Sequence, residues 1–156
     1  MRRFLFLPLV ALAAFCAHSG GTTQPSAQSG HGAITLTVAP NPIVAQPVSG
    51  TTYDFPFDAV VRETGGHAVR IHSISVNVYA FGGLRVGSDV YDASRITSLG
   101  FPTTVPANGE LRYRFRPRKE VPDERLFGSV TADVRIAAVD DTNTPTAAST
   151  MVTVRR

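Results

Sequence analysis

Cysteine and tryptophan are almost missing from this chain of 156 residues, which has one cysteine, Cys16, and no tryptophan. A single cysteine cannot form a disulfide within the chain, so a folded domain must draw its stability from its core. The same scarcity excludes zinc centres that are built from several thiolates.

Charge is also sparse. Charged residues make up 17% of the chain and hydrophobic residues 43%, and Lys119 is the one lysine. This balance argues against disorder over most of the length and favours a single globular domain. The formal charge is +3, and it falls to +1 if residues 1–19, which contain Arg2 and Arg3, are removed. Because nucleic-acid binding wants a concentrated basic face, we expect no nucleic-acid partner.

The one long hydrophobic run lies at the N-terminus. Arg2 and Arg3 precede an apolar run from Phe4 to Phe15. The run is too short to span a bilayer of roughly 30 Å as a helix. Followed by small residues, it predicts an export signal over residues 1–19.

Two ways of processing fit this signal. Ala17-His18-Ser19 suits an ordinary signal peptidase and would leave a soluble chain beginning at Gly20. The run that ends at Cys16 instead resembles a bacterial lipobox, except that Phe15 stands where that pattern has a small residue; this resemblance implies lipidation of Cys16. Residues 20–32 are small and polar and predict a flexible linker. We therefore expect an exported protein, periplasmic or extracellular, with a membrane contact only if Cys16 carries a lipid anchor.

Apolar and polar residues alternate with a period of two along the rest of the chain, and helical periodicity is lacking. In the ELRYRFR stretch, residues 110–116, Leu111, Tyr113 and Phe115 face one way and arginines the other. The alternation predicts strands over residues 33–38, 52–63, 68–80, 110–116, 127–139 and 147–154.

Three local features refine this pattern. Between residues 68 and 80 the parity of the apolar residues changes at His72-Ser73, which predicts a β-bulge or a strand that bends from one sheet into another. Gly65-Gly66 predicts a hairpin loop between the two flanking strands. Residues 84–101 are compatible with a short strand, a turn of helix or an irregular connection.

The predicted fold class is all-β: an antiparallel sandwich of about seven strands over residues 33–156. The alternating strands, the PANGE turn before ELRYRF and the long penultimate strand resemble immunoglobulin-like or fibronectin-type-III-like domains of bacterial exported proteins. The Cys-Trp-Cys centre of antibody domains is missing. The resemblance implies an architecture, and a function only by weak analogy.

Glu63, His67 and His72 form the most conspicuous group of chemically active side chains. A metal needs three or four converging donors, and the sequence offers no H-x-H pair or further ligand nearby, so we interpret them as polar residues around a hairpin. Asp141-Thr142-Asn143 begins like a calcium loop but lacks the Gly and Glu that should follow. No G-x-S-x-G motif occurs. We expect no catalytic residues, no metal and no cofactor.

One strand carries a cluster of cations. Arg112, Arg114 and Arg116 share one face, and Arg118 and Lys119 follow directly. These five residues are the candidate binding site for an anionic glycan, a lipid head group or an acidic protein. The alternative is a solvated outer face whose charges are balanced by acidic neighbours.

We therefore expect a non-catalytic binding or structural module of the cell envelope. An alternative is a protein-binding factor, such as a proteinase inhibitor or a periplasmic chaperone-like protein, acting through loops at residues 62–67, 100–109 and 140–146. A second alternative is a small-ligand carrier, which would require a pocket.

Overall fold

The computed structural model describes residues 30–156, so the predicted signal, Cys16 and most of the predicted linker lie outside the described residues. The described chain is mostly β-structure, and none of its helices is long and apolar enough to cross a membrane. Its elements are β1 (Ile34–Ala39), β2 (Ile43–Val44), β3 (Gln46–Ser49), β4 (Thr52–Asp54), β5 (Phe57–Glu63), β6 (Val69–Ala80), β7 (Leu84–Asp92), α1 (Ala93–Ser98), β8 (Thr104–Val105), β9 (Glu110–Phe115), β10 (Arg118–Glu120), a 3-10 helix η1 (Glu124–Gly128), β11 (Thr131–Asp140) and β12 (Pro145–Arg155).

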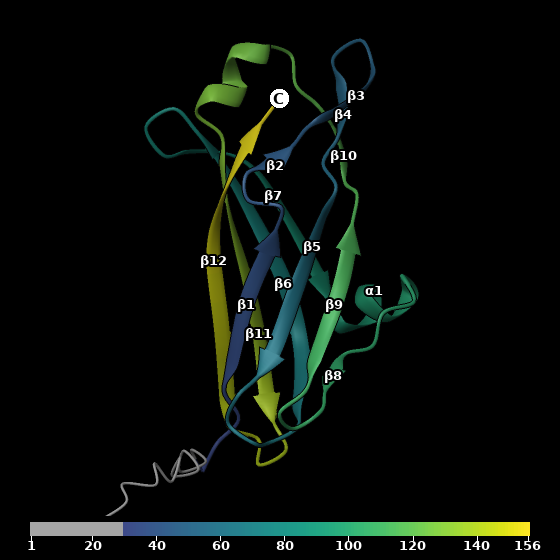
Figure 1. The fold of residues 1–156 in the computed structure, drawn as a ribbon, viewed down its shortest axis with the longest axis vertical. Coiled ribbons are helices and arrows are strands. Elements are labelled where there is room, and N and C mark those ends of the chain that lie inside the picture. Colours follow the sequence, from purple (N-terminus) through teal and green to yellow (C-terminus); the bar gives the residue numbers. More distant parts are fainter. Residues whose placement is uncertain (1–29) are drawn as a thin grey trace, which may run out of the picture.

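Seven strands of six or more residues form two layers (Figure 1). One layer has the order β1-β5-β9, and the other contains β12-β11-β6-β7. The chain crosses between the layers from β5 to β6, from β7 to β9 and from β9 to β11. This is the arrangement of an immunoglobulin-like β-sandwich. The predicted fold class and strand number are confirmed to this extent.

Short strands extend the sandwich at both ends, β8 at one and β2, β3, β4 and β10 at the other (Figure 1). β10, β4 and β3 form a small separate sheet, β8 pairs with β6, and β2 pairs with β12 in a parallel sense that the prediction of an antiparallel fold did not include. The strand predicted over residues 52–63 is split into β4 and β5 around Pro56. Proline has no N–H to donate to a ladder, which accounts for the interruption.

The loop after β5 is not the hairpin that Gly65-Gly66 predicted. β5 pairs with β1 and β9, whereas β6 pairs with β11, β7 and β8, so the chain changes sheets here. Glycine is needed for close packing: a Cβ on Gly65 would lie 2.2 Å from the backbone oxygen of His31. Glycine permits a tight loop both in a hairpin within one sheet and in a crossing between two sheets. Its presence therefore did not distinguish these two connections.

Two other predictions for the middle of the chain concern β6 and the segment after it. The bulge is confirmed, because Ala137 and Ala138 of β11 pair with Ser73 and Ile71 and leave His72 unmatched. The ambiguous segment 84–101 forms the nine-residue β7 and the short helix α1.

The core lies between the two layers. In β11 the inward residues Ala132, Val134, Ile136 and Ala138 are buried, as the alternation predicted. Tyr113 of β9 is fully buried, and its hydroxyl donates to the Pro102 carbonyl at 2.9 Å. Burial raises the pKa of Tyr113 to about 12, so this hydroxyl is a neutral donor.

Candidate functional site

Glu63 is a buried structural carboxylate. It is 1% exposed and accepts hydrogen bonds from the backbone N–H groups of Ala33, Gly65, Gly66 and Asn108 at 2.6–3.1 Å. Burial opposes its ionisation, but these four donors outweigh burial and keep the pKa of Glu63 below its usual value. Glu63 therefore links three segments at the end of β5, those at Ala33, at Gly65-Gly66 and at Asn108.

Asp140 holds the neighbouring turn in the same way. Its carboxylate accepts from the N–H groups of Gly32, Thr142 and Thr144 and from the Thr142 hydroxyl, at 2.7–2.9 Å. Burial disfavours its charge, yet these donors bring the pKa of Asp140 well below the usual range. The turn that resembled a calcium loop is thus organised by Asp140. Gly32, assigned by sequence to the linker, is buried against it.

The three loops considered for protein binding meet at one end of the sandwich. Glu63 binds Asn108, and His67 Nδ1 lies 2.9 Å from Asp141 Oδ1 on the surface. His72 is exposed on β6, away from this contact. Glu63, His67 and His72 are therefore not brought together. Among residues 30–156, no group of three His, Cys, Asp or Glu side chains is placed to hold a metal ion.

The cationic cluster is largely paired with aspartates. Arg112 lies 3.2 Å from Asp58, Lys119 lies 3.0 Å from Asp89, and both Arg116 and Arg118 face Asp54. Arg114 forms no ion pair within residues 30–156. The acidic neighbours that the solvated-face alternative required are present. Binding of an anion by Arg112, Arg114, Arg116, Arg118 and Lys119 stays a prediction.

Asp54 is a buried carboxylate at the end of β4. It is 6% exposed, and Arg118 donates to both of its oxygens, at 2.7 and 3.2 Å. This hydrogen bonding lowers the pKa of Asp54. The pair links β4 to β10 and so fixes the strand that borders the pocket described next.

An apolar pocket of about 580 Å³ lies between the layers, at the end opposite the three loops. Its floor is the inner face of the larger sheet. Gly87 of β7, Val78 of β6 and Ala132 of β11 lie side by side in one row of that face. Two of the three have little or no side chain, so space remains above this row.

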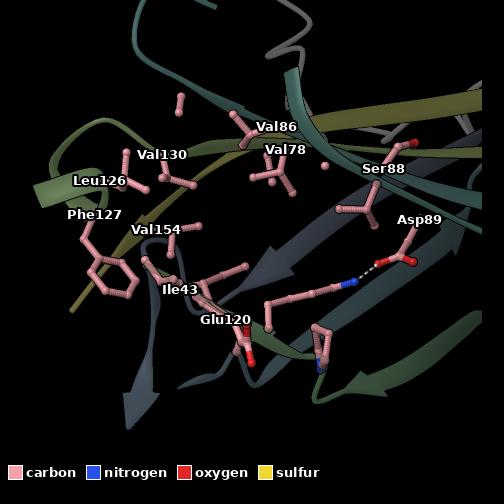
Figure 2. Close-up of a pocket in the computed structure, with 18 of the residues that line it drawn as sticks. Ile43, Val78, Val86, Ser88, Asp89, Glu120, Leu126, Phe127, Val130 and Val154 are labelled. Carbon is pink, nitrogen blue, oxygen red and sulfur yellow. Dashed lines mark ion pairs between the residues drawn. The ribbon is translucent and has the colours of Figure 1, made fainter. Parts of the chain in front are cut away.

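The segment 117–127 closes the other side of the pocket. It contains β10 and most of η1, which lie in the interval between the strands predicted over residues 110–116 and 127–139. The Phe127 ring packs edge-on against Tyr53, with ring centroids 5.1 Å apart, and the Tyr53 hydroxyl donates to Glu124 at 2.6 Å. This segment is therefore anchored on the small sheet and spans the gap. Figure 2 shows Leu126, Phe127 and Val130 lining it.

Polar groups are few in the pocket. Apart from Ser88, Asp89, Lys119 and Glu120, every lining residue is apolar or glycine. The Ser88 hydroxyl donates to Asn77 at 3.0 Å, so it is already engaged. Asp89 and Lys119 form the ion pair drawn as a dashed line in Figure 2. Chemically, such a site can enclose hydrocarbon and offer hydrogen bonds at its edge.

Comparison with known proteins supports the fold. No protein-family model matches the chain, and no curated protein matches it in sequence. Among solved structures, the structural-genomics target SoR45 is similar with a TM-score of 0.54 at 10% identity, over 81% of this chain and 88% of that one. A Bordetella pertussis protein described as ApaA has a TM-score of 0.51 at 13% identity, over 79% and 94% of the two chains. At such identities the likeness shows the immunoglobulin-like β-sandwich and nothing about function.

Proposed function

We propose that this protein is a non-catalytic, exported binding module that takes a small apolar or amphipathic ligand into the pocket between its sheets. The observation that carries the proposal is the pocket itself. Its volume of about 580 Å³ falls within the range of roughly 300–1,000 Å³ for small-ligand sites. Its lining, apolar with a few polar groups, is also that of such sites.

Unfilled space of this kind is uncommon inside a small domain. Protein interiors are close-packed, with few voids larger than a water molecule. Here Phe55, Val76 and Val78 are only half-buried although they face the interior. Covering apolar surface is worth roughly 25 cal/mol per Å², so a hydrocarbon ligand would gain from contact with these side chains.

Export and the lack of catalysis complete the proposal. Export rests on the N-terminal pattern of residues 1–19. The polar groups around the pocket include no histidine or cysteine, Ser88 donates to Asn77, and Lys119 is paired with Asp89. These contacts favour binding over turnover. Hydrolysis of peptide, ester or glycoside substrates by the purified protein would contradict the non-catalytic part of the proposal.

A fluorescence titration with the apolar probe N-phenyl-1-naphthylamine tests the binding site. We expect saturable binding to the wild type and its loss in Gly87→Leu, whose side chain would occupy the floor of the pocket. Ala147→Leu is the matched control, because it adds comparable bulk at an exposed position of β12 on the same sheet. Equal binding by all three proteins would place the probe elsewhere and refute the site.

Protein binding through the loops is a second candidate function. It is favoured by the convergence of the three loops at one end, where Glu63 and Asp140 hold their backbones in place. A preorganised loop surface lowers the entropic cost of association. This function predicts a stoichiometric protein partner that is lost with the surface variant Asp141→Arg but retained with Gly87→Leu. The reverse pattern would exclude it.

A further inference from the structure

The polar edge of the pocket is an ion pair between two strands that do not pair with each other. Lys119 of β10 and Asp89 of β7 come from different sheets, and their side chains approach to 3.0 Å. Their side chains are 58% and 31% exposed, so both reach solvent at the opening of the pocket, which we call its mouth. Since the Ser88 hydroxyl is engaged with Asn77, this pair supplies the polar contacts beside the apolar lining, with Glu120 next to it in the chain.

The pair leaves both donors and acceptors available. An ammonium group has three N–H donors and a carboxylate has two oxygens with several lone pairs. The interaction of Lys119 with one Asp89 oxygen uses part of this capacity. A hydroxyl group can accept from Lys119 and donate to Asp89 without separating them.

A charged head group fits this mouth less well. An anion attracted to Lys119 would also face the carboxylates of Asp89 and Glu120. A cation attracted to either carboxylate would face Lys119, which is already paired with Asp89. Either ion would compete with the existing partner. The mouth therefore discriminates by charge, and it favours a group that is polar and neutral.

We infer that the ligand is an uncharged, single-chain amphiphile whose hydrocarbon fills the pocket and whose hydroxyl-bearing head group binds at Lys119 and Asp89. The inference rests on the proposed function of the pocket. At roughly 30 Å³ per heavy atom, the share of a water molecule in the liquid, the cavity holds on the order of twenty heavy atoms. That is the size of one medium-length acyl chain with a small head group.

Three dodecyl amphiphiles test this class: monododecanoyl glycerol, dodecanoate and dodecylammonium. Each competes with N-phenyl-1-naphthylamine on the full chain, below its micelle concentration and at neutral pH. We expect the uncharged glycerol ester to bind about tenfold more tightly than either ion. Tighter or equal binding of dodecanoate or dodecylammonium by the wild type would overturn the inference.

Two single substitutions should change the preference in opposite directions. Asp89→Asn removes the partner of Lys119 and should strengthen the binding of dodecanoate about tenfold relative to that of the glycerol ester. Lys119→Gln removes the partner of Asp89 and should strengthen the binding of dodecylammonium by a similar factor. Asp58→Asn is the control, because Asp58 is similarly exposed and ion-paired with Arg112 but does not line the pocket. An unchanged order of affinities in both pocket variants would refute the role of the pair.

The two proposals fail in different ways. If the probe binds and Gly87→Leu abolishes its binding, but no dodecyl amphiphile displaces it, the ligand class is wrong and the pocket stands as a binding site. If the probe does not bind at all, the proposed function fails and the inference fails with it.

Discussion

Gly87 of β7 lies directly opposite Val78 of β6, and a Cβ atom placed on Gly87 would be 3.7 Å from the Cβ of Val78. This is ordinary van der Waals contact, and the backbone there is not in the left-handed region. Gly87 is therefore a position where a side chain would fit and none is present. The open space above β6 follows in part from this residue.

Filling that space should stabilise the unliganded protein. We expect Gly87→Leu to raise the free energy of unfolding by about 0.5–2 kcal/mol, since it adds apolar contact and removes the conformational freedom of a glycine in a strand. Urea unfolding monitored by circular dichroism measures the change, with Ala147→Leu as the control that should leave stability nearly constant. A loss of stability in Gly87→Leu would mean that the pocket has no room beside β7.

The role of Glu63 predicts a marked loss of stability in Glu63→Gln. The substituted amide would turn an NH2 group toward backbone N–H donors and leave at least one donor unpaired, at a cost of about 2 kcal/mol. The control is Glu110→Gln, whose carboxylate pairs with Arg62 on the surface at 3.0 Å and should matter little. Equal losses in the two variants would contradict the account of Glu63 as a structural anchor.

Stability should fall in acid. The pKa values of Glu63 and Asp140 are lowered in the folded state from ordinary values of 4.5 and 3.8, so the unfolded chain binds protons more readily. Their contribution is complete above those values and declines as the pH drops below them toward the folded-state values. Urea midpoints measured from pH 6 to pH 3 should decrease, and less steeply in Asp140→Asn. A variant with the wild-type slope would show that Asp140 is not one of the groups responsible.

The cationic cluster predicts unequal effects for two neighbouring arginines. Arg118→Met removes the bidentate partner of the buried Asp54, whereas Arg114→Met removes a side chain that has no ion pair within residues 30–156. We expect a clearly lower melting temperature for Arg118→Met and almost none of this effect for Arg114→Met. The same shift in both variants would imply that Asp54 does not depend on Arg118.

Most of the architecture could be predicted from the alternation of apolar and polar residues along the strands. The parity of Leu111, Tyr113 and Phe115, and the change of parity at His72, are direct consequences of which side chains face the core, so they could be read without the structure. The connection at Gly65-Gly66 could not be predicted in this way, because glycine indicates a tight loop but does not indicate the sheet to which the next strand belongs.

The site was less visible for a physical reason. A carboxylate such as Glu63 at the end of a strand looks like a surface residue until the segments that donate to it, at Ala33 and Asn108, are known to converge. A pocket is harder still, because it consists of space that side chains from distant segments leave open. Gly87 was the one local hint, in a stretch whose secondary structure the sequence left ambiguous.

Methyl NMR during titration with N-phenyl-1-naphthylamine tests the central claim most directly. The pocket predicts that the methyl signals of Val78 and Leu126 shift and saturate together, while those of Ile71 and Val105, buried at the other end of the sandwich, stay in place. Shifts centred on Ile71 and Val105, or no shift of Val78 and Leu126 at saturating probe, would contradict a ligand site between the sheets.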